Sequence, residues 1–365
     1  MRCCAVIAIG FAVFVAAVLG GLSAYVVYSV VSHKKDASKD CFTSARTVSS
    51  LMVCLSKYFY PKNSLTLEEW KLMLPTAQQR IAYTMVIKKL LSSDNNCSLI
   101  ELPSSIKNDI QIRIFQEKFC VLLNKKIDPN NGHFRSGWAV VIVPLERKNR
   151  LRMLHHSAPH ITFDFNTGNQ SAEVFENSQS YSLVVSAVSR DAVMESHSTC
   201  QPHYYPTDGA HDTDTVFHSA LQATLEWQLS SHSGCPHSTC AFIQWHGKRS
   251  CPEDIVFLSA GAKNSSLYSQ QNIPVVKLKN AIRAEWRSMG ISYTVNSPLE
   301  SRCKLVARAN VFGRLVNDPA TAKNPCTIYA KAMTGRFVHV EQSYPSRDPS
   351  QYVAWSAAVT SAFNP

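Results

Sequence analysis

The chain has few charged residues. They make up 17% of its 365 residues, whereas an average protein has roughly 25%. Internal repeats and low-complexity tracts are also absent, which excludes a repeat architecture and a largely disordered chain. Aromatic residues are plentiful, with 6 Trp and 13 Tyr. A folded protein of this length has room for one large domain or two modest ones.

Several common catalytic motifs are missing. There is no G-x-S-x-G sequence, so a serine nucleophile at a strand-to-helix turn is not expected. The phosphate-binding sequences G-x-x-x-x-G-K-[ST] and G-x-G-x-x-G are absent as well. The formal net charge of +11 is spread along the chain without a nucleic-acid-binding motif, so no nucleic-acid partner is expected. This charge indicates either a solvated basic face or an anionic substrate or surface.

Charge is absent from residues 5–31, which are almost wholly apolar. A helix of about 20 apolar residues spans a bilayer, whereas the apolar region of a signal peptide is shorter, about 7–15 residues. The stretch therefore predicts a transmembrane signal-anchor with the membrane as partner, and a cleaved signal peptide is the alternative. Lysines that follow the stretch mildly favour a cytoplasmic body, because positive charge prefers that side of the membrane.

The cysteines favour the opposite orientation. Beyond residue 40 lie ten cysteines, an even number without a C-x-x-C pair, which fits disulfides better than zinc knuckles. Glycosylation sequons at Asn96, Asn169 and Asn264 add a weaker argument in the same direction. We therefore expect a membrane-anchored, disulfide-bonded glycoprotein whose body is lumenal or extracellular. If the N-terminal segment is cleaved, the protein is secreted.

Residues 36–130 have apolar side chains at helical spacing. Helices are predicted at 43–58, 66–74 and 76–91, the second of them with acidic residues in its first turn. Four cysteines in this region are placed to staple it: Cys41, Cys54, Cys97 and Cys120. We interpret the region as a helical cap or stalk without a catalytic site.

From residue 137 onward, apolar stretches typical of strands alternate with helical stretches. The expected strands are 138–144, 180–188, 240–245, 255–258, 291–295 and 336–340. The expected helices are 171–178, 213–230, 275–289 and 351–363. This alternation predicts an α/β domain over residues 137–365, with a largely parallel mixed sheet flanked by helices. Ligands of such sheets bind beyond the carboxyl ends of the strands, so polar residues that follow a strand are the candidate site residues.

Ten of the thirteen histidines lie between residues 155 and 246, and histidine binds metals and protons near neutral pH. After the first expected strand, His156, His160 and Asp164 are spaced by four residues and could converge on one ion. Zinc accepts imidazole nitrogen and carboxylate oxygen. His246 directly follows a buried strand and precedes a glycine, which would let a ligand approach closely. These four residues are the candidate metal ligands, and ordinary hydrogen-bonded histidines are the alternative.

Glu341 is the candidate general base. It lies near the end of the strand 336–340 and shares a face with His339, because strand side chains alternate. A surface glutamate is the alternative interpretation.

His218 is a second candidate catalytic residue. It lies on the helix 213–230, four residues after Asp214, so the two side chains can meet. The acids before it are also typical of a helix start, with Asp212 or Thr213 as the N-cap. The dense run 208–218 is thus partly explained by helix formation alone.

Arg190, Arg314 and His211 are the candidate substrate-binding residues. Arg190 follows the strand 180–188 and could hold a carboxylate in a two-pronged hydrogen bond. Arg314 follows a glycine, and His211 lies on a loop over the expected site. An Arg190–Asp191 ion pair and a plain surface charge at Arg314 are the alternatives.

The order of these elements resembles the N-formylglutamate amidohydrolases and the wider group of zinc-carboxypeptidase-like hydrolases. The similarity covers about residues 138–345 and rests on short motifs: His156-Ser157 in an early loop, Ser189-Arg190 at a strand end, His218 on a helix and His246 after a strand. Zinc carboxypeptidases also place a glutamate base on a later strand, which corresponds here to Glu341.

Two motifs depart from the pattern. The H-x-x-E metal motif of the carboxypeptidases is absent, and His160-x-x-x-Asp164 would replace it. The sequence Gln244-Trp-His246-Gly247 stands where the amidohydrolases have Asp-Leu-His-Ser.

The resemblance implies a compact α/β fold and zinc-dependent hydrolysis of an amide bond beside a carboxylate, in a small anionic or peptide-like substrate. His156 or His160 would hold Zn²⁺ together with Asp164 and His246. Glu341 would take a proton from water and deliver it to the leaving group.

The remaining implied roles concern the substrate. Arg190 or Arg314 would hold its carboxylate, and His218 would help to polarise its carbonyl. Two other functions stay open at this point: a non-catalytic binding or surface protein on a degenerate hydrolase fold, and a metal-dependent phosphoesterase.

Overall fold

The computed structural model describes residues 37–231, 234–262, 265–319 and 324–364. The apolar stretch 5–31 lies outside these ranges. Within them, no helix combines the length and the apolar character that a membrane crossing requires.

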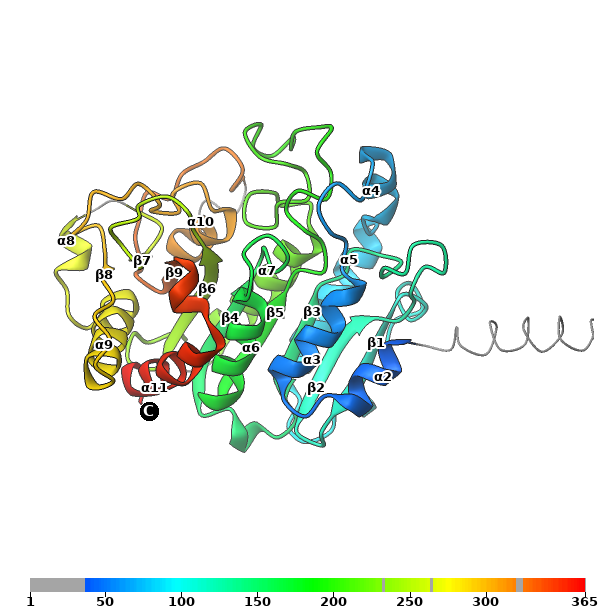
Figure 1. The fold of residues 1–365 in the computed structure, drawn as a ribbon. Coiled ribbons are helices and arrows are strands. Elements are labelled where there is room, and N and C mark those ends of the chain that lie inside the picture. Colours follow the sequence, from blue (N-terminus) through cyan, green and yellow to red (C-terminus); the bar gives the residue numbers. More distant parts are fainter. Residues whose placement is uncertain (1–36, 232–233, 263–264, 320–323, 365) are drawn as a thin grey trace, which may run out of the picture.

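A nine-stranded sheet runs through the molecule in the order β1-β2-β3-β5-β4-β6-β9-β7-β8 (Figure 1). Its strands are β1 (Ile110–Phe115), β2 (Phe119–Asn124), β3 (Val140–Pro144), β4 (Arg152–Ala158), β5 (Ser180–Val185), β6 (Cys240–Gly247), β7 (Val256–Ser259), β8 (Val295–Asn296) and β9 (Phe337–Gln342). The central strands β5, β4, β6 and β9 are mutually parallel. The expected mixed α/β sheet is therefore present. Within residues 137–365 four of its six pairings are parallel, and β1 and β2 extend it with two antiparallel pairings.

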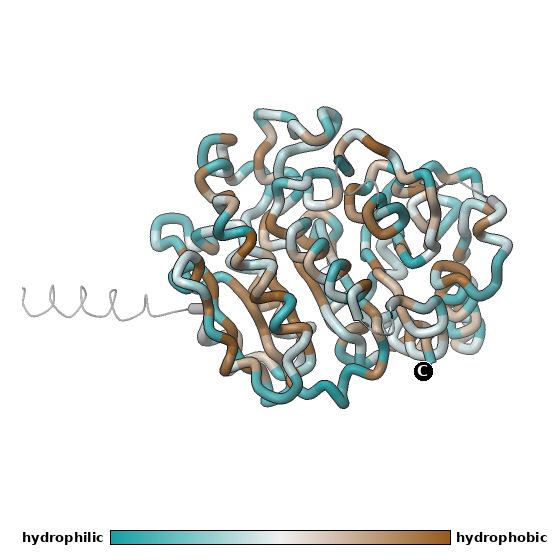
Figure 2. The backbone as a smooth tube through the Cα atoms, turned by 180° about the vertical axis from the view of Figure 1, so that it is seen from behind, coloured by the Kyte–Doolittle hydropathy of each residue, from teal (hydrophilic) through white to brown (hydrophobic). Residues whose placement is uncertain are grey.

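Helices cover both faces of this sheet (Figure 1). They are α2 (Ala37–Ser44), α3 (Val48–Leu55), α4 (Leu67–Met73), α5 (Ala77–Ser92), α6 (Thr167–Asn177), α7 (Val216–Ser230), α8 (Ser265–Tyr268), α9 (Pro274–Ser288), α10 (Val311–Asn317) and α11 (Tyr352–Ala362). On one face α3, α6, α11 and α9 pack in a row, and on the other face α5, α7 and α10 pack together. Figure 2 shows the hydrophobic residues concentrated in the strands and the helices that cover them.

Successive residues of the central strands enter opposite cores. Phe242 of β6 and Phe337 of β9 pack in the core with α5, α7 and α10. Trp245 and Val340 pack in the core with α9 and α11. Side chains two residues apart on a strand point to the same face of the sheet. Gln244 and His246 therefore share the face of Phe242, and His339 and Glu341 share the face of Phe337.

Most expected helices are confirmed, with boundaries shifted by a few residues. The helix α4 begins as expected, since Thr66 and Glu69 form a reciprocal capping box. The N-cap of α7 is Thr215, whose hydroxyl accepts from the His218 N–H, so the expected caps Asp212 and Thr213 are wrong.

Three strands were not expected. The strand β4 was interpreted as a loop, because its sequence places polar residues at successive positions that the fold nevertheless buries. The strands β1 and β2 lie within the region 36–130 that we interpreted as a helical cap or stalk, and β2 pairs with β3 of the main sheet. The expected strand 291–295 is reduced to the short β8.

The ten cysteines beyond residue 40 are all paired, which confirms the expected disulfides. The pairs are Cys41–Cys54, Cys97–Cys120, Cys200–Cys326, Cys235–Cys240 and Cys251–Cys303. The first two pairs lie in the N-terminal region, which these four cysteines were expected to staple.

Removal of the Cys200–Cys326 disulfide is expected to cost more stability than removal of Cys235–Cys240. The two pairs are separated by 126 and 5 residues. The loop-closure entropy that each removes from the unfolded chain is worth about 5 and about 2 kcal/mol, respectively. Denaturant unfolding of the two Cys→Ala double variants measures the difference, and equal losses would show that chain entropy does not govern it.

Candidate metal centre at the carboxyl edge of the sheet

The candidate site lies where the parallel strands β4, β6 and β9 end. In the register of β6 and β9, Gln244 lies opposite His339 and His246 lies opposite Glu341. All four side chains point to the same face of the sheet. The carboxyl edge of a parallel sheet is where α/β proteins bind their ligands, so the fold brings two polar pairs to the expected place.

His160 and Asp164 come from the segment between β4 and α6. The Asp164 N–H donates to the His160 carbonyl over 2.6 Å, which closes one helical turn. Residues four apart lie on the same side of such a turn, so both side chains face the sheet edge. The turn packs tightly against α6, since a Cβ on Gly168 would lie 2.2 Å from Ile161 Cδ1. A larger residue at position 168 would therefore have to displace the Ile161 side chain.

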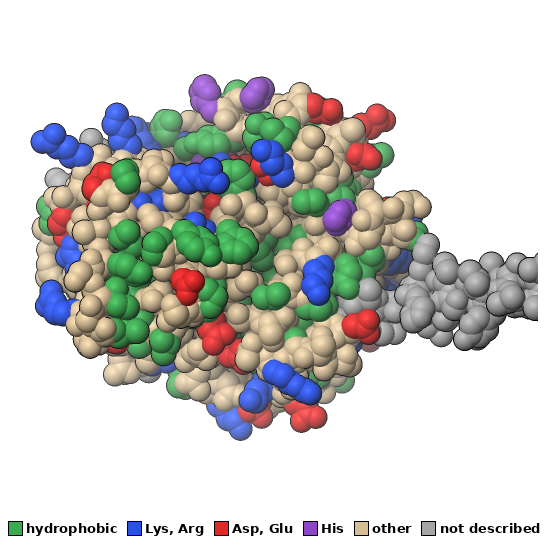
Figure 3. Space-filling model, viewed as in Figure 1, with side chains coloured by type: hydrophobic (Ala, Val, Ile, Leu, Met, Phe, Trp, Pro, Cys, Tyr) green, Lys and Arg blue, Asp and Glu red, His purple; other side chains and the backbone are tan. Residues whose placement is uncertain are grey.

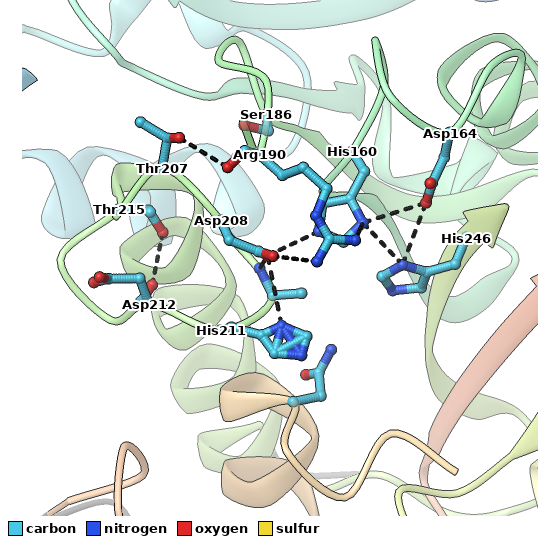
Figure 4. Close-up of polar contacts among 12 residues, drawn as sticks. His160, Asp164, Ser186, Arg190, Thr207, Asp208, His211, Asp212, Thr215 and His246 are labelled. Atoms are coloured by element: carbon cyan, nitrogen blue, oxygen red, sulfur yellow. Dashed lines mark hydrogen bonds and ion pairs between the residues drawn. The ribbon is translucent and has the colours of Figure 1, made fainter. Parts of the chain in front are cut away.

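His160, Asp164 and His246 meet in what we call the histidine–aspartate cluster (Figure 4). His160 Nδ1 lies 3.2 Å from Asp164 Oδ2 and 3.2 Å from His246 Nδ1. The third edge, from His246 Nδ1 to Asp164 Oδ2, is 3.5 Å. All three residues are buried, so the cluster is a compact triangle of ligand atoms.

The dimensions of this triangle fit a zinc ion. Tetrahedral zinc has bonds of about 2.0–2.2 Å to nitrogen and oxygen, which places neighbouring ligand atoms roughly 3.3–3.6 Å apart. Three protein ligands with an open fourth position are typical of catalytic zinc rather than structural zinc. The set of three ligands therefore suits a metal that also binds water or substrate.

The hydrogen bonds of the two Nε2 atoms orient both histidines so that their Nδ1 atoms face Asp164. His160 Nε2 lies 2.9 Å from Asp208 Oδ1, and His246 Nε2 lies 2.9 Å from Gln244 Oε1. Since carboxylate and amide oxygens accept, both histidines donate from Nε2 and present the lone pair of Nδ1. Metal-binding histidines usually donate their second nitrogen in this way. Burial lowers the pKa of His246 to about 4. Burial and Arg190 oppose a proton on His160, but Asp208 and Asp164 raise its pKa above the usual value, so a metal bound there would displace a proton from His160.

Asp208 links the cluster to Arg190. The carboxylate is fully buried, and its Oδ2 accepts from Arg190 Nη2 over 2.5 Å while its Oδ1 accepts from His160. Burial alone would raise the pKa of Asp208, but His211, His160 and Arg190 lower it well below its usual range. Arg190 therefore forms an ion pair with Asp208 rather than with Asp191, whose Oδ1 accepts from Ser189.

Replacing Asp208 with asparagine is expected to weaken metal binding about 10–100-fold, because the residue that orients His160 loses its charge. Competition with a chromophoric chelator measures this affinity. Asp212→Asn is the matched control: this buried acid lies on the same loop but bonds Ser198 instead of the cluster, and zinc affinity within about threefold of wild type is expected. An equal loss in both variants would contradict the role of Asp208.

Glu341 and His339 flank the cluster on β9. Glu341 Oε1 lies 3.7 Å from His339 Nε2, and both side chains form a second possible metal-binding group with His246. Among the described residues, neither Glu341 Oε2 nor His339 Nδ1 has a hydrogen-bond partner, although both atoms are buried. Burial and then the charge of Asp164 raise the pKa of Glu341 to about 8. Such a group is suited to exchange a proton near neutral pH.

Three of the expected site residues lie elsewhere. His156 Nδ1 accepts from the Trp245 indole and its Nε2 bonds Ser180, so both ring nitrogens are used in the core. Arg314 donates to the backbone carbonyls of residues 308, 325 and 326. His218 is buried beside Arg80, and burial lowers its pKa to about 4. The structure does not bring these three residues to the cluster.

His211 does lie at the site. Its ring stacks on Tyr204 with 3.5 Å between centroids, and its Nδ1 is 3.6 Å from Asp208 Oδ1. Burial is the main reason why its pKa falls to about 3. A neutral His211 is thus held beside the residue that orients His160.

Two adjoining cavities reach the cluster. An inner cavity of about 340 Å³ is lined by His160, His246, His339 and Glu341. An outer cavity of about 1130 Å³ lies beside it and is lined by Asp164 and Arg347 among others. Both are bordered by the same three residues: Arg190, Leu305 and Glu341. The cluster therefore lies in reach of a substrate.

Sequence reasoning missed Asp208, Gln244, His339 and Arg347 as site residues. Gln244 and His339 carry a signal that a strand pattern offers, because each lies two residues before a candidate residue and so shares its face. Asp208 and Arg347 lie far along the chain from the ligands that they approach. Only the folded structure shows their proximity.

Comparisons with known proteins find few relatives. No family model matches the chain, and no curated protein matches it. Among solved structures, a poly-gamma-glutamate hydrolase from a bacteriophage has 12% identity and a TM-score of 0.33, over 62% of this chain and 88% of that chain.

Two further solved structures are similar at the same distant level. A succinylglutamate desuccinalase from Vibrio parahaemolyticus has 9% identity and a TM-score of 0.33, over 70% of this chain and 76% of that chain. A protein named as a candidate carboxypeptidase A from Shewanella denitrificans has 10% identity and a TM-score of 0.29, over 61% of this chain and 59% of that chain. All three similarities are distant.

Proposed function

We propose that this protein is a zinc-dependent hydrolase that cleaves an amide bond next to a carboxylate in a small anionic or peptide-like substrate. The observation that carries the proposal is the triangle of His160 Nδ1, Asp164 Oδ2 and His246 Nδ1, with edges of 3.2–3.5 Å. Its ligand types and its dimensions suit zinc. The two cavities that meet beside it leave room for a substrate.

The cluster residues would hold the metal, and a zinc ion bound there would polarise the scissile carbonyl and acidify water. Glu341 is the general base in this proposal. Glu341 lines both cavities, and its buried Oε2 has no hydrogen-bond partner among the described residues. Its carboxylate takes a proton from the attacking water and returns it to the leaving nitrogen.

Arg190 stabilises negative charge that develops on the substrate. Its Nη1 lies 3.5 Å from His160 Nδ1, at the edge of the cluster, while its Nη2 is anchored by Asp208. Because Asp208 already holds the guanidinium in place, little reorganisation free energy is needed when negative charge develops on the carbonyl oxygen. His211 shields the Asp208 carboxylate. Arg314 and His218 take no part in the proposed reaction.

A non-catalytic function is the second candidate. A proton on His160 Nδ1 would also satisfy Asp164 Oδ2 at 3.2 Å, so the same cluster could stand as a metal-free ion pair. Metal analysis of the purified protein separates the two candidates. One zinc per chain supports the hydrolase, and no bound metal after zinc-replete expression rejects it.

The substrate class is tested separately on the zinc-loaded protein. N-acyl amino acids are expected to be hydrolysed, and phosphate esters are not. Activity on phosphate esters alone would identify a phosphoesterase instead.

We further infer that the body of the protein is lumenal or extracellular, because its five disulfides require an oxidising compartment to persist. Anchoring by residues 5–31 and glycosylation at the exposed Asn96 belong to the same inference. A mobility shift on glycosidase treatment and retention in carbonate-washed membranes are the expected results. Reduced cysteines in the cellular protein would contradict the inference.

A further inference from the structure

One of the disulfides joins two loops beside the candidate metal centre. Cys251, in the loop between β6 and β7, is bonded to Cys303, in the irregular segment between β8 and α10. Both residues line a surface cavity of about 410 Å³, and Cys251 is only half-buried. A small thiol can therefore reach this disulfide, as thiol–disulfide exchange requires.

Positive charge lies close to this disulfide. The buried Lys248 ammonium donates to the Cys251 carbonyl over 2.9 Å. The charged residues that line the cavity are Arg302, Lys304 and Glu253. Asp254 is a second acid nearby, and its carboxylate accepts from two neutral side chains. Figure 3 shows several Lys and Arg side chains in the upper left of the face seen there, over the part of the molecule in which Figure 1 labels β7 and α10. Cations beside a disulfide stabilise the thiolate that departs during exchange.

Residues 302–307, which we call the strap, have few anchors. In the described part of the chain, the backbone hydrogen bonds of the strap are all made within residues 301–310. Beyond that range, the strap packs on Phe257 through Cys303 and Val306. Apart from the two ends of the strap, its covalent connection to the rest of the described molecule is the Cys251–Cys303 bond. The position of the strap therefore depends on this disulfide.

The backbone is strained on both sides of the disulfide. Cys251 and Ala307 each have a φ of 55°, in the left-handed region that costs free energy for a residue with a Cβ. Such residues persist where the surrounding structure holds them, and they are frequent in segments that switch. Opening the disulfide removes one of the constraints that hold these two residues in place.

The strap forms a wall of the inner cavity. Residues 304–307 line this cavity together with His160, His246 and Glu341, and Leu305 of the strap lines the outer cavity as well. Phe257, on which the strap packs, lies opposite Glu341 in the pairing of β7 with β9. Movement of the strap away from Phe257 therefore widens the route to the histidine–aspartate cluster.

We propose that Cys251–Cys303 is a site of thiol–disulfide exchange and that its reduction by a dithiol releases the strap from the inner cavity. One thiolate of the dithiol attacks Cys251 Sγ, the bond between the two sulfur atoms breaks, and Cys303 leaves as a thiolate. The second thiolate of the dithiol attacks the mixed disulfide and frees Cys251. The protein pair gains two electrons and two protons, and the dithiol loses them and becomes a disulfide.

The other disulfides are less suited to this exchange. Both cysteines are buried in the pairs Cys97–Cys120 and Cys235–Cys240. The Thr213 hydroxyl lies against both sulfur atoms of Cys200–Cys326. Cys41–Cys54 joins α2 to α3, and two helices that hold their own hydrogen bonds keep the thiols close together after reduction. A pair of that kind re-forms readily, because its thiols retain a high effective concentration.

Stepwise reduction of the full-length protein with dithiothreitol tests the proposal. Free thiols are trapped with iodoacetamide at successive times and located by peptide mass spectrometry. Cys251 and Cys303 are expected to be alkylated at least about tenfold faster than the cysteines of the other pairs, because access and nearby cations both favour their exchange. Amide hydrogen exchange in residues 302–307 is expected to rise about tenfold or more once this pair is reduced.

Two double variants separate the strap from the other disulfides. Cys251→Ser/Cys303→Ser is expected to show fast hydrogen exchange in the strap without any reductant. Cys41→Ser/Cys54→Ser is the matched control, and the strap is expected to exchange in it as slowly as in the wild type.

A third double variant keeps the disulfide and so decides the question if Cys251→Ser/Cys303→Ser does not fold. Arg302→Gln/Lys304→Gln removes two exposed charges beside the departing thiolate. It is expected to slow the alkylation of Cys251 and Cys303 about 3–10-fold.

Three results would overturn the proposal. They are reduction of Cys251–Cys303 no earlier than another pair, unchanged hydrogen exchange in the strap after its reduction, and an unchanged rate of reduction in Arg302→Gln/Lys304→Gln. None of these measurements needs zinc or turnover. The proposed hydrolase function fails by a different result, the absence of bound zinc, so the two failures are distinguishable.

Discussion

Replacing His246 with alanine is expected to abolish zinc binding and hydrolysis at limiting metal. Zinc bound by protein ligands at neutral pH contributes about 10–16 kcal/mol, so one of three ligands supplies about 3–5 kcal/mol, or on the order of 10²–10⁴ in affinity. His246 provides one corner of the triangle, 3.2 Å from His160 Nδ1. Metal analysis and turnover of an N-acyl amino acid measure the two losses.

The matched control for this variant is His156→Gln. His156 is also buried, on the neighbouring strand β4, and its spacing to His160 and Asp164 makes it a candidate ligand. Its nitrogens bond Trp245 and Ser180 instead, and a glutamine retains hydrogen-bonding capacity there. The His156→Gln variant is expected to keep its zinc and to show only a lower free energy of unfolding. If His156→Gln loses the metal and His246→Ala retains it, the assignment of ligands is wrong.

Replacing Glu341 with glutamine is expected to lower kcat about 10²–10⁴-fold, because the variant lacks the group that transfers the proton. Zinc content is expected to stay at the wild-type value, since Glu341 lies outside the histidine–aspartate cluster. Steady-state kinetics and metal analysis on the same preparation separate these two effects. The combination of normal zinc with lost turnover is what distinguishes a general base from a metal ligand.

Asp191→Asn is the control for Glu341→Gln. Asp191 is a buried acid that lines the same outer cavity, but its carboxylate accepts a hydrogen bond from Ser189. Turnover within about threefold of wild type is expected. Loss of zinc in Glu341→Gln would instead indicate that Glu341 and His339 take part in metal binding, as their proximity to His246 permits.

Much of the fold followed from local sequence patterns. Helices such as α4 carry a local start signal, because acidic residues lie in the first turn and the structure adds a capping box of Thr66 and Glu69. The strand β4 gave no such signal, because His155 and His156 are buried by partners that lie far along the chain: Ser182, Gln228 and Trp245. A polar strand of this kind is recognisable only when its partners are known.

The site residues divide in the same way into those with a local sequence signal and those placed by partners far along the chain. His246 and Glu341 follow buried strands, and parallel strands end at one edge, so their proximity could be inferred from the chain alone. Arg190 was expected to hold a substrate carboxylate, yet Asp208 occupies its Nη2. Arg347 carries no sequence signal, and only the fold places its guanidinium at the outer cavity beside Gly247, where a Cβ would lie 2.6 Å from its Cζ.

An anomalous-scattering experiment at the zinc edge tests the central claim most directly. Crystals of the protein, grown without chelator, are measured above and below the edge. The account predicts one peak about 2.0–2.2 Å from each of His160 Nδ1, Asp164 Oδ2 and His246 Nδ1. A map without a peak among these three atoms, from protein that hydrolyses N-acyl amino acids, would contradict it.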